Sequence, residues 1–256
     1  MSAALPEAFL RAPIAHRALH DIAAGRPENS RAAIRAAVAA GYGIEIDLQV
    51  SADGQAMVFH DYDLGRLTAQ AGAVRLRSAA ELGAIALKGG DGEGIPTLSE
   101  VLGIVAGQVP LLVEIKDQDG AMGAGVGALE QAAARALAGY GGPVAVMSFN
   151  PHSVAAFGAC APDIPRGLTT SAYDPDDWNL SRAICDRLRG IPDFDRVGAA
   201  FISHEAGDLD RDRVQALRAS GVPVLCWTIR TPEEERAARI LADNVTFEGY
   251  PPPLPG

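Results

Sequence analysis

The most informative segment of the sequence is GIEIDLQVSADGQAMVFHD, residues 43–61. In its first half, apolar and β-branched residues alternate with polar ones, and this pattern predicts a strand. Strand side chains point to opposite faces with a period of two, so Glu45 and Asp47 share one face. The turn SADG then leads to an extended return that ends at His60. The stretch therefore places two carboxylates side by side in a segment that looks buried, with a histidine close by.

Short apolar runs alternate with helical patterns along the rest of the chain. Alternating strands and helices predict parallel βαβ units, and eight of them in about 250 residues is the size of a (β/α)8 TIM barrel. An open doubly wound sheet is the alternative that the same pattern allows. The expected strands are 13–16, 43–50, 110–115, 143–149, 166–170, 197–203, 222–229 and 244–249, and the expected helices are 30–42, 97–105, 124–139, 151–158, 176–189, 209–219 and 232–242.

The chain is expected to form one α/β domain over residues 1–256. Residues 61–96 are less regular and are expected to form a short insertion after the second strand. The last expected strand is followed by YPPPLPG, which cannot form a helix. Residues 5–11, which precede the first strand, are therefore expected to cover the bottom of the barrel.

Composition excludes several classes of partner. A formal net charge of −10 argues against nucleic acid and against anionic membrane surfaces. No stretch approaches the length of a transmembrane helix, and the N-terminus lacks the pattern of a secretory signal. The three cysteines are far apart, which makes a reduced, cytoplasmic setting the default. A small-molecule partner is expected, and the oligomeric state stays open.

Three acids are expected at the carboxyl ends of neighbouring strands, where barrel active sites lie. Glu45 and Asp47 come from the second strand and Glu114 from the third. Adjacent buried carboxylates repel one another, and a divalent cation resolves that repulsion. An all-oxygen set suits Ca²⁺ or Mg²⁺. The alternative is a salt-bridge network in which Lys116 and Arg17 neutralise the acids.

His16 and His60 each end an apolar run and are expected to meet at the same mouth. Such a pair can share general-acid and general-base work, although a lone histidine in such a place is more often structural. Arg17 and Lys116 could bind phosphate oxygens, and Trp227 could form an apolar wall for a carbon skeleton. Together these groups are what phosphodiester cleavage needs. Weaker candidates are Glu28, which could lean into the site, and His204 and Glu205 at the rim, whereas His20 is expected at the surface.

Six motifs in order along the chain resemble the glycerophosphodiester phosphodiesterase family. They are AHRA (15–18), RPENS (26–30), IEIDLQVSADGQAMVFHD (44–61), IPTLSEVL (95–102), LLVEIK (111–116) and VPVLCWTI (222–229). The resemblance implies a TIM barrel that hydrolyses glycerophosphodiesters to glycerol 3-phosphate and an alcohol with a divalent cation. It implies His16 and His60 as the catalytic pair, Glu45, Asp47 and Glu114 as metal ligands, and Arg17 and Lys116 as phosphate contacts.

The sequence departs from the family pattern in two places near these motifs. HRA stands where the family has HRG, so Ala18 must tolerate the backbone turn after Arg17. At the end of the last strand Glu248 stands where an Asp is common. Two alternative functions remain open: a lysophospholipase D or phospholipase C-like activity, which requires an exposed apolar strip at the mouth, and a barrel that binds glycerophosphates without turnover.

Overall fold

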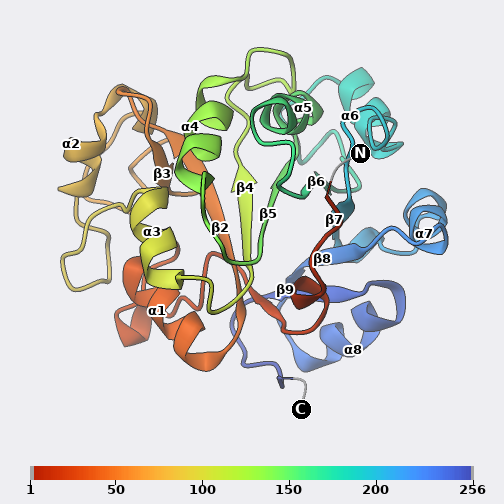
Figure 1. Cartoon of the computed structure of the whole chain (residues 1–256), viewed down its shortest axis with the longest axis horizontal. Coiled ribbons are helices and arrows are strands. Elements are labelled where there is room, and N and C mark those ends of the chain that lie inside the picture. The colour runs from red at the N-terminus through yellow and green to blue at the C-terminus, as the bar shows by residue number, and fades with distance from the viewer. Residues whose placement is uncertain (1–2, 255–256) are drawn as a thin grey trace.

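Eight parallel strands close into a barrel with the helices around it in the computed structural model, which describes residues 3–254 (Figure 1). Neighbouring strands follow the order β1-β9-β8-β7-β6-β5-β4-β2, and β1 also pairs with β2, which completes the ring. The fold is therefore the expected (β/α)8 barrel. The barrel strands are β1 (Ile14–Ala15), β2 (Gly43–Val50), β4 (Leu111–Ile115), β5 (Val144–Ser148), β6 (Arg166–Thr170), β7 (Phe201–Glu205), β8 (Val224–Ile229) and β9 (Asn244–Phe247).

Most helices begin where the sequence places a capping side chain. Ser30 accepts a hydrogen bond from the Ala33 amide at the start of α1, and Thr97 and Glu100 form a capping box at the start of α3. The α-helices are α1 (Arg31–Ala40), α2 (Ala79–Gly83), α3 (Leu98–Val105), α4 (Ala128–Leu137), α5 (Pro151–Cys160), α6 (Arg182–Arg189), α7 (Asp212–Ala219) and α8 (Pro232–Leu241).

The strands separate two cores by the alternation of their side chains. On β2 the apolar residues Ile44, Ile46 and Leu48 belong to the large cluster between barrel and helices, so Glu45 and Asp47 point into the barrel. Inside the barrel, the lower level is filled by a second apolar cluster that includes Leu112 and Phe201. The upper level carries the polar side chains, which is what positions the site.

The barrel bottom is closed by the segment before β1, as expected. The short 3-10 helix η1 (Glu7–Leu10) places Phe9, which is fully buried, in the inner apolar cluster. Asn244, at the start of β9, is also fully buried. Its amide donates hydrogen bonds of 2.7 Å to the carbonyl oxygens of Phe9 and Ala12. One side chain thus ties the N-terminal plug to the barrel.

Replacing Asn244 with alanine should lower the free energy of unfolding by about 2–4 kcal/mol. The change leaves two buried carbonyl oxygens without a donor, and each costs about 1–3 kcal/mol. Chemical denaturation of the purified proteins measures the difference. Asn179→Ala is the matched control, because Asn179 is exposed. Equal unfolding midpoints for the two variants would show that the plug is not held by Asn244.

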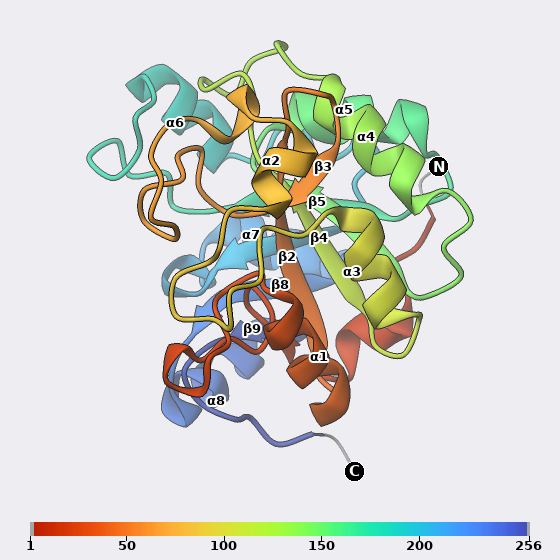
Figure 2. The same ribbon diagram turned by 90° about the vertical axis from the view of Figure 1, so that its left-hand side faces the viewer.

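The insertion after β2 has more structure than the sequence indicated. The extended return before His60 is β3 (Ala56–Val58), which pairs antiparallel with β2 as the sequence led us to expect, and the insertion that follows contains the 3-10 helix η3 (Val74–Leu76) and α2. This part stands at the left edge of Figure 1 and faces the viewer in Figure 2. It buries a small apolar cluster of its own, which includes Phe59 and Leu82. The insertion is therefore packed, and it fixes the position of His60 at its start.

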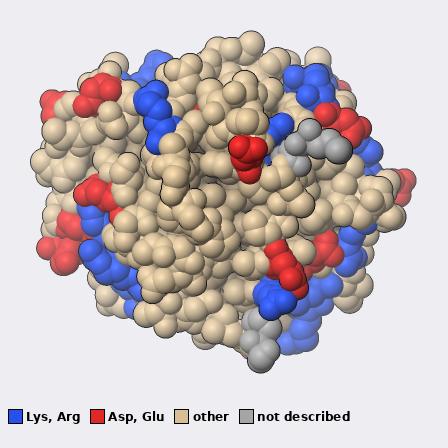
Figure 3. Space-filling model, in the orientation of Figure 1, with Lys and Arg blue, Asp and Glu red and all other residues tan. Residues whose placement is uncertain are grey.

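The surface carries no sign of a single dominant charge on the face shown in Figure 3, where acidic and basic side chains are interspersed. No helix within residues 3–254 combines the length and the apolar composition needed to cross a membrane.

Candidate active site

A pocket of about 180 Å³ opens at the carboxyl ends of the strands, where the sequence places the candidate residues. We call it the inner pocket. Asp47 does not line it, but it lies next to Glu45 and Glu114, with carboxylate oxygens of all three within 4.8 Å of one another. The inner pocket is lined by seven of the eight candidates: His16, Arg17, Glu45, His60, Glu114, Lys116 and Trp227.

The three acids are buried, and two of them, Asp47 and Glu114, form ion pairs with the same side chain, Lys116. Lys116 Nζ lies 2.6 Å from Asp47 Oδ1 and 2.5 Å from Glu114 Oε1. Glu45 accepts a hydrogen bond of 2.9 Å from the backbone N–H of Arg17. No lysine, arginine or histidine side chain forms an ion pair with Glu45 among residues 3–254. The salt-bridge network weighed from the sequence is thus present, but it leaves Glu45 without a cationic side chain.

Burial and charge shift the pKa values of this cluster in opposite directions. Burial, together with Asp47 and Glu114, raises the pKa of Glu45 well above its usual value. Burial also disfavours the charged form of Asp47, but Lys116, His60 and Arg17 outweigh it and hold the pKa of Asp47 far below the usual range. Lys116 pairs with Asp47 and Glu114, whereas Glu45 faces these two carboxylates with no cationic side chain beside it in the described part of the chain. Three hard oxygen donors therefore fit a divalent cation at this place.

The two histidines have the same arrangement of partners. His16 Nδ1 lies 2.7 Å from Glu248 Oε2, and His60 Nδ1 lies 2.7 Å from Asp61 Oδ1. A carboxylate can only accept, so in each neutral ring the proton sits on Nδ1 and Nε2 is left as a base. Burial lowers the pKa of His16 despite its bond to Glu248, and it lowers the pKa of His60 to about 4 despite the nearby Asp47.

Stability should fall in acid partly because of His60. Its pKa is about 4 in the folded protein and about 6.5 in an unfolded chain. Between these pH values His60 is protonated in the unfolded chain but stays neutral in the folded protein. The free energy of unfolding therefore falls as the pH drops from 6.5 towards 4. After allowance for its partial exposure, we expect the loss between pH 7 and pH 4.5 to be about 1–2 kcal/mol smaller in His60→Asn. Denaturant unfolding of both proteins at pH 7 and pH 4.5, in the presence of a chelator, measures this loss. An equal loss of unfolding free energy in the wild type and in the variant would contradict the prediction.

The loop after β1 adopts a constrained conformation that aims Arg17. Arg17 and Ala18 both have positive φ, 51° and 64°, so the alanine of HRA does tolerate the left-handed turn. This turn lets the Arg17 backbone N–H reach Glu45, while the guanidinium bonds Glu28 at 2.8 Å. Glu28 therefore contacts a residue of the site without lining the inner pocket itself.

Several residues that contact the site lie in loops, and the sequence patterns did not identify them as candidates. Arg66, in the insertion, bonds both Glu28 and Asp61, so it links the Arg17 loop to His60. Asn29 was not among the candidates, yet its side-chain amide donates to Asp47 Oδ2 at 2.8 Å. The motif RPENS was the available signal for Asn29. No pattern in the sequence pointed to Arg66.

Two histidines lie elsewhere than expected. His20 is half-buried rather than at the surface, and its Nε2 lies 3.6 Å from Glu248 Oε2, next to His16. His204 is fully buried and bonds Thr170 and Asp208, so it does not line the rim. Alternation along β7 turns His204 towards the helices, because Phe201 and therefore position 203 face inward.

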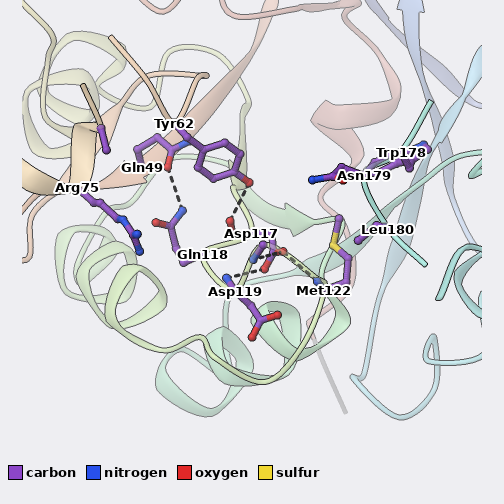
Figure 4. Close-up of a pocket in the computed structure, with 12 residues that line it drawn as sticks. Gln49, Tyr62, Arg75, Asp117, Gln118, Asp119, Met122, Trp178, Asn179 and Leu180 are labelled. Atoms are coloured by element: carbon purple, nitrogen blue, oxygen red, sulfur yellow. Dashed lines mark hydrogen bonds between the residues drawn. The ribbon is translucent and has the colours of Figure 1, made fainter. Parts of the chain in front are cut away.

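Two further cavities continue from the inner pocket across the mouth. A corridor of about 500 Å³ shares His60, Glu114 and Lys116 with the inner pocket. It shares Tyr62 and Trp178 with an outer cavity of about 530 Å³ (Figure 4). In that cavity the Tyr62 hydroxyl donates to the Asp117 carbonyl oxygen, and Gln118 donates to Gln49. Gln49 in turn donates to the His60 carbonyl oxygen, which steadies the backbone of that histidine.

Comparisons with known proteins point to one family. A curated relative, a putative glycerophosphodiester phosphodiesterase of Bacillus subtilis (strain 168), is 29% identical over 91% of this chain and 90% of its own. A glycerophosphodiester phosphodiesterase of Caldanaerobacter subterraneus subsp. tengcongensis is 27% identical over 86% and 87%. Among solved structures, a phosphodiesterase of Oleispira antarctica in complex with the product sn-glycerol-3-phosphate matches with a TM-score of 0.76. It is 26% identical and the match covers 93% of this chain and 92% of that one.

The family model described as the glycerophosphoryl diester phosphodiesterase family matches residues 16–246, which runs from the first candidate histidine to the last barrel strand. This match spans most of the chain, and the barrel, the acid cluster and the histidine pair all lie within it. The chain belongs to the glycerophosphoryl diester phosphodiesterase family.

Proposed function

We propose that this enzyme hydrolyses glycerophosphodiesters to glycerol 3-phosphate and an alcohol, with Ca²⁺ or Mg²⁺ bound by Glu45, Asp47 and Glu114. The observation that carries the proposal is the convergence of two neutral histidines, two cations and this acid cluster on one small pocket. The Oleispira antarctica relative, which holds sn-glycerol-3-phosphate, supports the same substrate class.

Each of the remaining side chains has a role that its chemistry suits. Arg17 and Lys116 bind phosphate oxygens, and Trp227 forms an apolar wall against the glycerol carbons. The Trp227 ring is fixed because its Nε1–H donates to the Ser203 carbonyl oxygen at 3.0 Å. One histidine accepts a proton at Nε2 from the attacking oxygen, and the other delivers a proton to the leaving alcohol. When bound, the divalent cation supplies positive charge against the phosphoryl oxygens.

The leaving alcohol has room to extend outward. The corridor begins at His60 and is walled by Tyr62, Met122 and Trp178. Beyond it the outer cavity is wide and open, so the site sets little limit on the size of the alcohol. We therefore expect headgroups of different size, such as glycerol, ethanolamine and choline, to be released.

A coupled assay for glycerol 3-phosphate across several glycerophosphodiesters tests the function. Release should require a divalent cation, stop after exhaustive chelation, and return when Ca²⁺ or Mg²⁺ is added. Full activity of the chelated protein would refute the metal requirement. Binding of glycerol 3-phosphate without any turnover, at any divalent cation, would instead favour the non-catalytic barrel.

The lipid-directed alternatives receive no support from the surface. They require an apolar strip at the mouth, yet among residues 3–254 only one of the exposed large apolar side chains, Tyr62, lines the three cavities described above. We therefore do not propose a lysophospholipase D or phospholipase C-like activity for this enzyme.

A further inference from the structure

The barrel interior divides into an acidic half and a hydroxyl half at the level of the site. Glu45 and Glu114 project inward from β2 and β4. Across the barrel, Ser203 of β7 projects inward because it lies two residues after Phe201 of the inner cluster, and Thr169 of β6 pairs with it in register. Thr246 of β9 also projects inward, because its neighbours Val245 and Phe247 belong to the outer cluster. The acids are explained by the cation site, whereas no part of the proposed mechanism uses the hydroxyls.

All three hydroxyls are buried and unpartnered. Thr169, Ser203 and Thr246 are no more than 1% exposed, and their hydroxyl oxygens have no hydrogen-bond partner among the described residues. Buried polar groups in folded proteins nearly always have a partner in the protein, in ordered water or in a ligand. The three hydroxyls lie on β6, β7 and β9, which belong to one half of the barrel with β8 between β7 and β9. Unpartnered hydroxyls at this level therefore indicate a polar occupant that the protein itself does not supply.

Only two of the three hydroxyl residues reach the inner pocket. Thr169 and Thr246 line it, while Ser203 does not. The inner pocket has room for several waters, each of which takes about 30 Å³ at liquid density. Its charged side is occupied by Arg17, Lys116 and Arg230, which suit phosphate oxygens. The uncharged threonine side suits a group that both donates and accepts hydrogen bonds, which a hydroxyl does.

We propose that Thr169 and Thr246 form a subsite for the hydroxyl groups of the glycerol moiety and so select glycerol-bearing phosphodiesters. The proposal rests on the proposed function and deepens it. In the free enzyme ordered water satisfies the two threonines, and the substrate's hydroxyls displace that water. A diester without these hydroxyls leaves both threonines buried and unpaired, and such a mismatch is what makes hydroxyl-binding sites discriminate strongly.

Isosteric variants test the subsite with kinetics. We compare Thr169→Val and Thr246→Val on glycerophosphocholine and on propyl phosphocholine, which lacks both hydroxyls. Each variant should lose about 10–30-fold in kcat/KM on the glycerol substrate, whereas on the propyl one it should lose nothing and can gain, because the unpaired hydroxyl is gone. Ser203→Ala is the matched control: it removes the same kind of buried hydroxyl outside the pocket and should change neither value. Equal losses on both substrates would show that the threonines serve the phosphate or the fold, and no loss would show that they hold water only.

A binding measurement separates this proposal from the proposed function. Calorimetric titration with glycerol 3-phosphate and with inorganic phosphate needs no turnover. Each threonine variant should weaken glycerol 3-phosphate binding about 10-fold and leave phosphate binding unchanged. If no phosphodiester is cleaved by any form but this difference appears, the proposed function fails and the subsite stands. If cleavage is normal and the difference is absent, the subsite fails alone.

Discussion

Glu45→Gln should abolish phosphodiesterase activity while making the metal-free protein more stable. We expect kcat/KM for a glycerophosphodiester to fall about 10³-fold or more, because loss of one carboxylate weakens a cation that contributes several kcal/mol to the reaction. Glu45 is 2% exposed and faces Asp47 and Glu114, with only a backbone N–H as partner. A neutral amide at this place removes a like-charge contact and can donate to the neighbouring carboxylates.

The sign of the stability change follows from the pKa shift. The pKa of Glu45 is raised in the folded protein, so at pH 7 the unfolded chain gains by ionising this group and the fold is penalised. The penalty is absent below the pKa of an unfolded glutamate, about 4.3. Glu45→Gln should therefore raise the free energy of unfolding by roughly 1–2 kcal/mol at pH 7 in chelator, and the gain should vanish near pH 4.

A third readout ties both effects to the cation. Ca²⁺ or Mg²⁺ at 100 times its dissociation constant should stabilise the wild-type protein by about 2.7 kcal/mol and leave Glu45→Gln unchanged. Glu130→Gln is the matched control, because Glu130 is also fully buried but lies on α4, away from the pocket. That variant should keep its activity and its cation response. A Glu45→Gln protein that still turns over and still responds to the cation would overturn the metal site.

The sequence predicted the barrel well because the barrel depends on periodicity. All eight expected strands overlap observed ones, and β2 has the expected bounds of 43–50. The predicted strand boundaries differ from the observed ones where the residues next to a strand are as apolar as those within it. Residues 197–203 read as a strand, yet β7 is Phe201–Glu205, and Val197 is buried in a turn before it. Likewise α6 begins only at Arg182, after the cap Ser181, because the segment before it forms the wall that carries Trp178.

The candidate site divides in the same way between strand and loop residues. The side chains at strand ends, such as His16, Glu45, Glu114 and Trp227, were predicted because a barrel brings all strand ends to one rim. Arg66 was not predicted, because its hydrogen bond to Asp61 depends on how the insertion packs. Loop residues have no periodic signal, so their long-range contacts follow only from the tertiary fold.

His60→Ala and His16→Ala should each reduce kcat on glycerophosphocholine by about 10³-fold, within the usual range for a general acid or base. Cation-induced stabilisation should persist in both, since neither histidine belongs to the acid cluster. We also propose how the two roles divide. His60 lines the corridor through which the alcohol leaves as well as the inner pocket, whereas His16 lines the inner pocket but not the corridor or outer cavity. We therefore expect His60 to protonate the leaving alcohol and His16 to act as the base.

A glycerophosphodiester of p-nitrophenol separates the two roles, because this good leaving group departs without a proton. On that substrate His60→Ala should recover most of its lost rate, while His16→Ala should stay impaired. The positioning carboxylates should follow their histidines: Asp61→Asn should be rescued by p-nitrophenol and Glu248→Gln should not, because they hold Nδ1 of His60 and His16 respectively. The opposite pattern of rescue would exchange the two roles. Equal impairment of both histidine variants on both substrates would mean that neither donates the proton, since protonation of the alcohol is the one step that p-nitrophenol makes unnecessary.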